Sequence, residues 1–457
     1  MKKLCLCLRR GRLLSRPLQA VLMAAVSLLP AAAQEAARQW TLDECISYAI
    51  ENNISLRKAG LQRQSAAEDV LQSRAALLPS LDFSTSHSVS YSPWLESGKS
   101  TVANGYVESN VDKVFYNGSY SLGASWTVWN GNKNRNTLRL NRLTEQQSAV
   151  DSTTTAKSIE EQIIQLYIQI LYSADAIEVN KASLEASKKN EERGQAMLEV
   201  GSMSRADVAQ LTAQRAQDEY NVVAAESQLR TYKRQMKQLL EITETEEFDV
   251  ATPSIADSEV LGPIPALASV YANALNNRPE IKSELLAIES SDLNIKIAKA
   301  GRMPTIALSA SVGTNSTTMS STAWGSQLKT NFDASAGVSL SLPIFDNRST
   351  RTTINKARIS RETSQLELRE IEKTLYATIE GYWLDATTNQ DMFRAAIASV
   401  ESEQASYDLL SEQFALGLKN IVELMTGKAN LLSAQQSALQ SKYMTLMNMK
   451  MLELYNE

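Results

Sequence analysis

The sequence predicts a mainly α-helical protein with a smaller membrane β-barrel part, built from two copies of one unit. Three observations predict this fold class: the sequence repeats at a nearly constant offset, long proline-free stretches have coiled-coil spacing, and four segments alternate apolar with small polar residues. Each unit is expected to run as helix, two strands, long helix, tight turn and helix. The repeat decides the architecture, and the other two observations assign its elements.

The composition excludes several classes of function. The chain has 457 residues, 43% of them hydrophobic, and a net charge of -5. No long basic run follows the N-terminal segment, so we expect no nucleic-acid partner. His87 is the single histidine, and only Cys45 of the three cysteines lies beyond the first seven residues. We therefore expect no metal site, no cofactor, no internal disulfide and no enzyme activity.

The N-terminus has the pattern of a targeting segment. Six lysine and arginine residues lie within the first 16 positions, and an apolar run follows from about Leu18 to Leu29. Ala31, Ala32 and Ala33 then provide a small-residue cleavage site. The apolar run is short for a membrane span. Residues 1–33 are therefore predicted to be a signal peptide.

The internal repeat divides the remaining chain. Residues 49–79 match residues 274–304 at an offset of 225, and residues 200–208 match residues 416–424 at an offset of 216. The offset falls by nine between Pro79 and Asn130, where a length difference indicates an exposed loop. The predicted repeats are residues 34–263 and 264–457, joined by an acidic, Ser- and Pro-containing linker near residues 244–265.

The helical parts of the two repeats carry the same seam. Apolar residues recur at spacings of 4, 3 and 4 in the first copy (Ile159, Ile163, Leu166 and Ile170) and in the second (Leu375, Ile379, Tyr382 and Ala386). This spacing is typical of a coiled coil. No proline occurs from residue 130 to residue 200. A single helix over this stretch would be roughly 100 Å long at about 1.5 Å per residue.

Four strands are predicted near residues 80–92, 119–129, 305–314 and 332–345. In the first, SLDFSTSHSVSYS, apolar residues such as Leu81, Phe83 and Val89 alternate with serine or aspartate. Each strand has an apolar face and a small polar face and is long enough to cross a membrane at a tilt. No second set of strands could bury the apolar faces, which disfavours a sandwich. We interpret the apolar face as lipid-facing and the serine face as lumen-facing.

Four strands in lipid cannot leave their edges open, because unpaired backbone groups there cost several kcal/mol each. Two chains would close a barrel of eight strands, and side chains would fill its interior. Three chains would close 12 strands and leave a lumen that serine could line. The polar face favours a barrel shared among chains, with three as the prediction.

Taken together, these features resemble the outer membrane efflux protein family. The resemblance rests on the duplicated unit, TLDECISYAIENN from Thr41, the prolines at the helix-to-strand changes (Pro79 and Pro304), LPIFDNR from Leu342, and the motifs around Gly201 and Gly417. It implies a homotrimer in the outer membrane of a Gram-negative bacterium, with a 12-stranded β-barrel and a long α-helical barrel extending into the periplasm. Its implied function is the outer membrane channel of a tripartite efflux or type I secretion system.

The resemblance also implies partners and site residues. The partners are outer membrane lipid, a periplasmic adaptor, and an inner-membrane pump of the resistance-nodulation-division or ABC type. The two helix-turn-helix tips would meet the adaptor through Gly201, Ser202, Gly417 and Leu418. Glu423 is expected to form an acidic constriction at the periplasmic mouth, with Phe414 beside it and Asp207 and Lys419 holding it shut. Thr426 stands where the family often has a second acid, one turn after Glu423.

Bland alternatives exist for these residues and for the whole chain. Gly201 and Gly417 fit C-cap positions of helices, and the nearby charges fit simple stabilisation of helix N-termini. The chain could also be a structural coiled-coil protein of the envelope without transport activity, although that reading does not explain four amphipathic strands. The transported substrate is not predicted.

Overall fold

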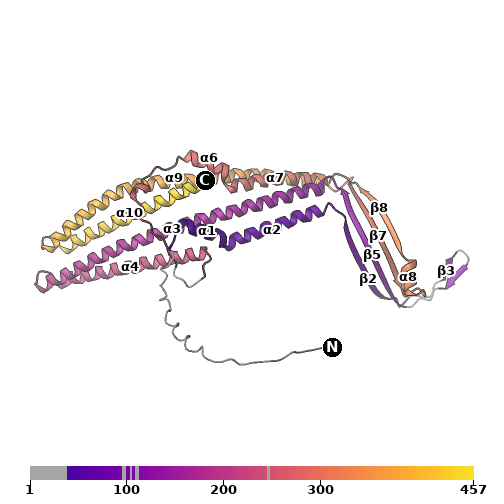
Figure 1. Ribbon diagram of the computed structural model, residues 1–457, viewed down its shortest axis with the longest axis horizontal. Helices are drawn as coiled ribbons and strands as arrows, with labels where there is room; N and C mark the ends of the chain where they lie inside the picture. Colours follow the sequence, from indigo (N-terminus) through magenta and orange to yellow (C-terminus); the bar gives the residue numbers. More distant parts are fainter. Residues whose placement is uncertain (1–38, 95–98, 103–104, 109–112, 244–247) are drawn as a thin grey trace, which may run out of the picture.

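The computed structural model describes residues 39–94, 99–102, 105–108, 113–243 and 248–457, so the predicted signal peptide lies outside the described residues. A long assembly of helices occupies most of the molecule, and a sheet extends from one end of it (Figure 1). The two helical hairpins end at tips on the side opposite to the sheet. Among the described helices, none combines the length and the apolarity required to cross a membrane.

The helices occur in two matching sets. In the first set they are α1 (Leu42–Asn52), α2 (Ile54–Ala75), α3 (Lys133–Glu199) and α4 (Arg205–Leu239); in the second they are α6 (Leu267–Asn277), α7 (Pro279–Ala300), α9 (Ser349–Ala415) and α10 (Ile421–Asn456). Both α3 and α9 have 67 residues. The first two helices of each set begin 225 residues apart and the last two 216 apart. These are the offsets of the sequence repeat.

The short and long helices of each repeat are separated by local signals. α1 begins with a capping box, in which Thr41 accepts from the Glu44 backbone and Glu44 accepts in return. Asn53 caps α2 and donates from its amide to the Leu239 carbonyl at 3.0 Å, which ties α2 to the end of α4. In the second repeat Pro279 is the first residue of α7, where a missing N–H costs nothing.

The segment between the repeats has little regular structure. β6 (Asp249–Val250) pairs in parallel with β1 (Gln39–Trp40), so the linker lies against the start of the described chain. It is followed by α5 (Asp257–Val260). Lys442 of α10 donates to the Ile255 carbonyl and pairs with Asp257, both at 2.9 Å. The linker is therefore fastened to both repeats at the middle of the helical assembly.

The sheet joins strands from both repeats. Its order is β2 (Ser80–Tyr91), β5 (Val114–Trp129), β7 (Thr305–Thr317) and β8 (Asp333–Ser341), all antiparallel. β5 begins five residues before the predicted start because its first residues pair with the end of β2. β8 ends four residues before the predicted end, and Pro343, which has no N–H to donate, follows it. The strands β3 (Lys99–Val102) and β4 (Gly105–Glu108) and the helix α8 (Trp324–Thr330) lie in the connections.

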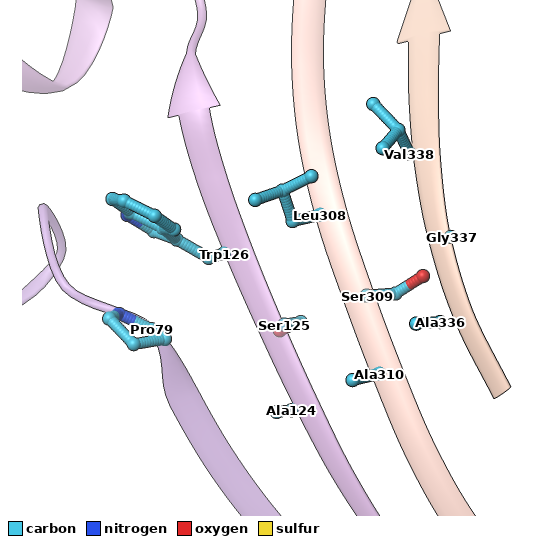
Figure 2. Close-up of a pocket in the computed structure, with 10 residues that line it drawn as sticks. All are labelled: Pro79, Ala124, Ser125, Trp126, Leu308, Ser309, Ala310, Ala336, Gly337 and Val338. Carbon is cyan, nitrogen blue, oxygen red and sulfur yellow. The ribbon is translucent and has the colours of Figure 1, made fainter. Parts of the chain in front are cut away.

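The register separates an apolar and a polar face. Trp126, Leu308 and Val338 form one row across β5, β7 and β8 (Figure 2). On the other face serine hydroxyls bond across neighbouring strands at 2.7–2.8 Å: Ser80 with Ser125, Ser86 with Ser119, and Ser311 with Ser335. The alternation predicted from the sequence is thus present across all four strands.

His87 lies on the apolar face, two residues from Val89, and not on the face expected for a lumen. Its imidazole stacks on Tyr116 and contacts the Tyr120 ring edge-on, and its two ring nitrogens bond the hydroxyls of Tyr116 and Thr85. Directly opposite lies Gly118, where an added Cβ would come within 3.1 Å of the ring. The alternation of the strand places His87 on the apolar face, and Gly118, which has no side chain, leaves space for the imidazole.

The helical core lies where α1, α3, α4 and α10 meet. Ile163, Ile170, Met236 and Met451 are fully buried there. In the second repeat Ile379 and Ala386 are fully buried in a smaller cluster with α6 and α10. These residues include much of the predicted seam, whereas Leu166, Leu375 and Tyr382 are only partly buried.

Cys45 lies in the same core without solvent contact. Burial raises the pKa of its thiol to about 12, with a further contribution from the Glu44 carboxylate. A thiol with so high a pKa carries almost no thiolate at neutral pH and is chemically inert. Cys45 is therefore a packing residue.

The change from strand to long helix uses left-handed backbone in both repeats. Gly131 and Asn132 have φ of 65° and 64°, and the matching Asn347 and Arg348 have φ of 50° and 68°. A Cβ at Gly131 would lie 2.6 Å from Cβ of Met303. This position needs glycine for conformation and for space.

We expect Gly131→Ala to lower the thermal stability of the chain in detergent, measured by loss of helical circular dichroism. The left-handed conformation alone costs about 1–2 kcal/mol in a non-glycine residue, and Met303 must also move. Arg348→Gly, at the matching turn, removes such a cost and is the control, with unchanged or higher stability. Equal melting temperatures for wild type and Gly131→Ala would contradict this assignment.

Candidate functional site: the paired helix tips

The two tips have the same backbone turn. In the first, the N–H groups of Gly201 and Ser202 donate to the carbonyls of Leu198 and Met197 at 3.0 and 2.9 Å; in the second, Gly417 and Leu418 donate to Phe414 and Gln413 at the same distances. Both glycines have left-handed φ, of 78° and 74°. This is a Schellman motif, which ends a helix and satisfies its last carbonyls. Both glycines therefore have the geometry expected of a residue that ends a helix.

Each returning helix is capped by a polar side chain. Ser204 accepts from the Asp207 N–H at 3.1 Å at the start of α4. Asn420 accepts from the Glu423 N–H at 2.9 Å at the start of α10, and Glu423 accepts from the Asn420 N–H at 3.3 Å. Glu423 is thus the third residue of a capping box. Part of its role is local and structural.

Glu423 also forms an ion pair within its own turn. Lys419 Nζ lies 2.5 Å from Glu423 Oε1, and the two side chains are 37% and 40% exposed. The hydrogen bond from Lys419, followed by that from the Asn420 backbone, holds the pKa of the Glu423 carboxyl below its usual value. The carboxylate expected to form an acidic constriction is therefore balanced by a lysine four residues earlier.

Asp207 and Lys419 do not meet in this structure. Asp207 accepts a hydrogen bond from the Ser204 hydroxyl at 2.7 Å, whereas Lys419 pairs with Glu423. The expectation that Asp207 and Lys419 hold the mouth shut is not matched by any contact within one chain. Lys419 directly precedes the N-cap Asn420, and Glu423 is the third residue of α10, so the short turn between them places the two side chains close together.

Phe414 is a core residue of the tip within one chain. Its side chain is 2% exposed and packs in a cluster with Leu211, Tyr407, Ile421, Leu424 and Leu431. α3 and α4 form the first helical hairpin, and α9 and α10 form the second. This cluster joins α4 of the first hairpin to both helices of the second. The aromatic ring is buried because it fills the space between the two hairpins.

The outer surface of the tips is apolar and exposed. Val200, Leu416 and Leu418 are 79%, 74% and 70% exposed, and Val422 is 60% exposed. Gly201 and Gly417 have open space around their Cα atoms. Exposed apolar residues gathered at one end of a molecule indicate a contact surface. We call Val200, Leu416, Leu418 and Val422 the tip surface.

A buried trio of polar residues, two of them charged, lies next to the Phe414 cluster, and the sequence analysis missed it. It consists of Ser187 on α3, Asp218 on α4 and Lys428 on α10. Lys428 donates to both Asp218 and Ser187, Ser187 donates to Asp218 at 2.5 Å, and Gln214 donates to the second Asp218 oxygen at 3.1 Å. The side chains of Lys428 and Asp218 are 7% and 1% exposed. Burial lowers the pKa of the Lys428 ammonium, and its bond to Asp218 acts in the opposite direction.

Further polar contacts connect the hairpins near this trio. Asn190 of α3 donates to the Tyr407 hydroxyl of α9 at 3.1 Å in a buried position. Arg193 donates to the Ser411 carbonyl at 3.3 Å. The hairpins are therefore linked by directional bonds as well as by apolar packing.

A signal for the trio existed in the sequence. Lys428 stands at spacings of 4 and 3 from the buried Leu424 and Leu431, and Asp218 stands 7 residues after the buried Leu211. A charge at a seam position of a coiled coil calls for a buried partner. The two residues are 210 apart, so the sequence could not pair them.

The tips offer contacts and fixed charges rather than reactive chemistry. Among the described residues, no group of three or more His, Cys, Asp or Glu side chains is placed to hold a metal ion within one chain. The arrangement consists of exposed apolar side chains at the turns and a paired lysine and glutamate at the start of α10.

Comparison with known proteins assigns this fold. The family model described as "Outer membrane efflux protein" matches residues 45–240 and 270–454, which are most of both repeats. The chain is 23% identical over 414 residues to "Outer membrane protein TolC" of Escherichia coli, covering 87% of this chain and 78% of the relative. It is 23% identical over 289 residues to "Outer membrane efflux protein BepC" of Brucella suis, covering 62% and 59%.

Solved structures have the same fold at low identity. The structure of CusC matches with a TM-score of 0.76 at 17% identity over 92% of each chain. The Campylobacter jejuni CmeC outer membrane channel matches with a TM-score of 0.73 at 18% identity, covering 91% of this chain and 85% of that one. The chain therefore belongs to the outer membrane efflux protein family, whose members are channels of the outer membrane that serve efflux systems and not enzymes.

Proposed function

We propose that three copies of this chain form one channel, which receives substrates from an inner-membrane pump through a periplasmic adaptor and releases them outside the cell. Each copy contributes four strands to a 12-stranded barrel in the outer membrane and its long helices to an α-helical barrel in the periplasm. The sheet is the observation that carries this proposal.

The two outer strands of the sheet, β2 and β8, each have an unpaired edge within the described chain. Their apolar residues are widely exposed in a single copy, with Leu81 and Val338 at 71% and 74%. In lipid, unpaired backbone groups cost several kcal/mol each, so β8 of one copy must pair with β2 of the next. Three copies give 12 strands and a lumen, whereas two give eight strands and a filled interior.

The apolar face of the sheet is about as tall as the lipid-facing apolar band of an outer-membrane barrel. Trp126 and Tyr116 lie at opposite ends of it on β5, ten positions apart. At about 3.3 Å per residue and a tilt near 40°, the separation along the membrane normal is roughly 25 Å. Aromatic residues at both limits are typical of the two membrane interfaces.

The tips are proposed to form the periplasmic mouth. Gly201, Ser202, Gly417 and Leu418 lie at the turns, and the tip surface around them is exposed and apolar. This supports docking of an adaptor there. Lys419 and Glu423, as an ion pair in each of three copies, would set the charge of the aperture. Efflux is favoured over protein secretion by the name of the Brucella relative, and the type of pump is left open.

The test is reconstitution of the purified mature chain. We expect crosslinking in mild detergent to stop at trimers and the protein to conduct ions across planar bilayers. A structural envelope protein would give no conductance, and a chain that stays monomeric while folded would refute the shared barrel. Co-purification of a periplasmic adaptor from native membranes, lost in a Leu416→Asp/Leu418→Asp variant that still forms trimers, would test the docking role separately.

A further inference from the structure

The polar face of the sheet carries charge of one sign. β2, β5, β7 and β8 contain no lysine or arginine, and their ionised residues are Asp82 of β2 and Asp333 of β8. The register places Asp82 in a row with Ser311 and Ser335, and Asp333 opposite Gly313. Both aspartates therefore belong to the serine face.

The carboxylate of Asp82 occupies space on that face that a neighbouring glycine leaves open. It lies directly opposite Gly123, where an added Cβ would come within 3.3 and 3.4 Å of the two carboxylate oxygens. A strand glycine often marks a point where another group approaches the backbone closely. The carboxylate thus lies over the β5 backbone, and a larger residue at position 123 would displace it.

Neither carboxylate is neutralised within the described chain. The nearby serine hydroxyls bond one another, as in the pairs Ser80 with Ser125 and Ser311 with Ser335. No hydrogen bond or ion pair joins Asp82 or Asp333 to another described residue. His87 is on the opposite face. The polar face is therefore uniformly negative.

The two aspartates lie at different heights. β2 runs away from the helices and β8 runs back towards them, as Figure 1 shows. Asp82 is two residues from the start of β2, and Asp333 is the first residue of β8. Asp82 therefore lies near the helical end of the sheet and Asp333 at its far end.

We propose that Asp82 and Asp333 form two rings of three carboxylates that make the β-barrel a charge filter. The filter favours cationic solutes and disfavours anionic ones. This inference rests on the proposed trimeric channel. It deepens that function by assigning a charge preference to the membrane part, separate from the charges at the tips. Carboxylates about 10 Å from the axis and a Debye length near 8 Å give roughly a twofold cation preference per ring.

The experiment measures reversal potentials of single channels in planar bilayers under a KCl gradient. Asp82→Ser and Asp333→Ser place the common residue of this face at each position, so the fold should be kept. We expect each variant to lower the potassium-to-chloride permeability ratio by roughly twofold, and the double variant by more. Ser84→Asn, on the same face of β2, changes size without charge and should match the wild type.

Salt dependence provides a second readout. The wild-type preference should grow when KCl is lowered from 0.1 M to 0.01 M, as the Debye length rises from about 10 to about 30 Å. The double serine variant should show a weaker growth. Unchanged permeability ratios in both serine variants that conduct would refute the filter while leaving the channel intact. Absence of conductance in the wild type would instead refute the proposed function. If the serine variants fail to insert, Gly123→Ala, which displaces Asp82, should change the ratio, and no change would refute the Asp82 ring.

Discussion

Lys428→Met should open the tip half of the helical assembly. The substitution leaves the Asp218 carboxylate, 1% exposed, without its cation. Removing one partner of a buried ion pair typically costs about 3–5 kcal/mol. Amides near the trio on α4 and α10 should then exchange with deuterium roughly a hundredfold faster or more, because exchange there reports local opening.

Two further variants make this prediction specific. Lys428→Met/Asp218→Leu removes both charges and should recover most of the protection, since an apolar pair can replace a buried ion pair at little cost. Lys450→Met breaks an exposed pair with Glu453 on the same helix and should cost at most about 1 kcal/mol. If Lys428→Met behaves like Lys450→Met, the trio does not hold the hairpins together.

A change of ion selectivity on neutralising Glu423 or Lys419 is the second expected result. Glu423→Gln keeps the capping-box acceptor but leaves Lys419 unbalanced, so the proposed mouth of a trimer would gain three positive charges. We expect ion selectivity in planar bilayers to shift towards anions. Lys419→Ala should shift it towards cations and introduce block by divalent cations, because three bare carboxylates then line the aperture.

The double variant Glu423→Gln/Lys419→Ala restores the net charge of the wild type and should restore its selectivity. If all three variants match the wild type, Lys419 and Glu423 are helix-end residues remote from the aperture. Conductance through such unaffected channels would show that the mouth is formed elsewhere.

The pH dependence of this pair follows from the direction of the pKa shift. The folded-state pKa of Glu423 is below the usual value of 4.5, with the Lys419 hydrogen bond as the main cause. The contribution of the pair is therefore fully present above pH 4.5 and is lost as the pH falls through the lowered pKa. We expect selectivity to be constant between pH 7 and pH 5 and to shift towards anions at more acidic pH.

Much of the fold could be predicted because the spacing of apolar residues along the sequence differs between helices and strands. Alternation with period two predicted the strands, and the 4, 3, 4 spacing predicted α3 and α9. The exact ends of β5 and β8 depend on pairing with strands elsewhere in the chain and on Pro343. The face of His87 follows from alternation alone, because it lies two positions before Val89 on β2.

The tip residues show where sequence inference stops. Resemblance and spacing identified both turns, but not which charges meet. Asp207 and Lys419 have opposite charge at similar turns, whereas the contact is between Lys419 and Glu423. Phe414 is buried because α4, α9 and α10 converge on it. Such outcomes depend on how two hairpins pack.

The sequence by itself determined the duplication, the helix and strand types, the two faces of the sheet and the capped turns, because each rests on residues a few positions apart. Tertiary structure alone decided the strand order that pairs β5 with β7 across the repeats, the meeting of Asp218 with Lys428, and the burial of Phe414. These contacts join residues distant in sequence, whose distances are fixed only when both hairpins and both repeats have packed.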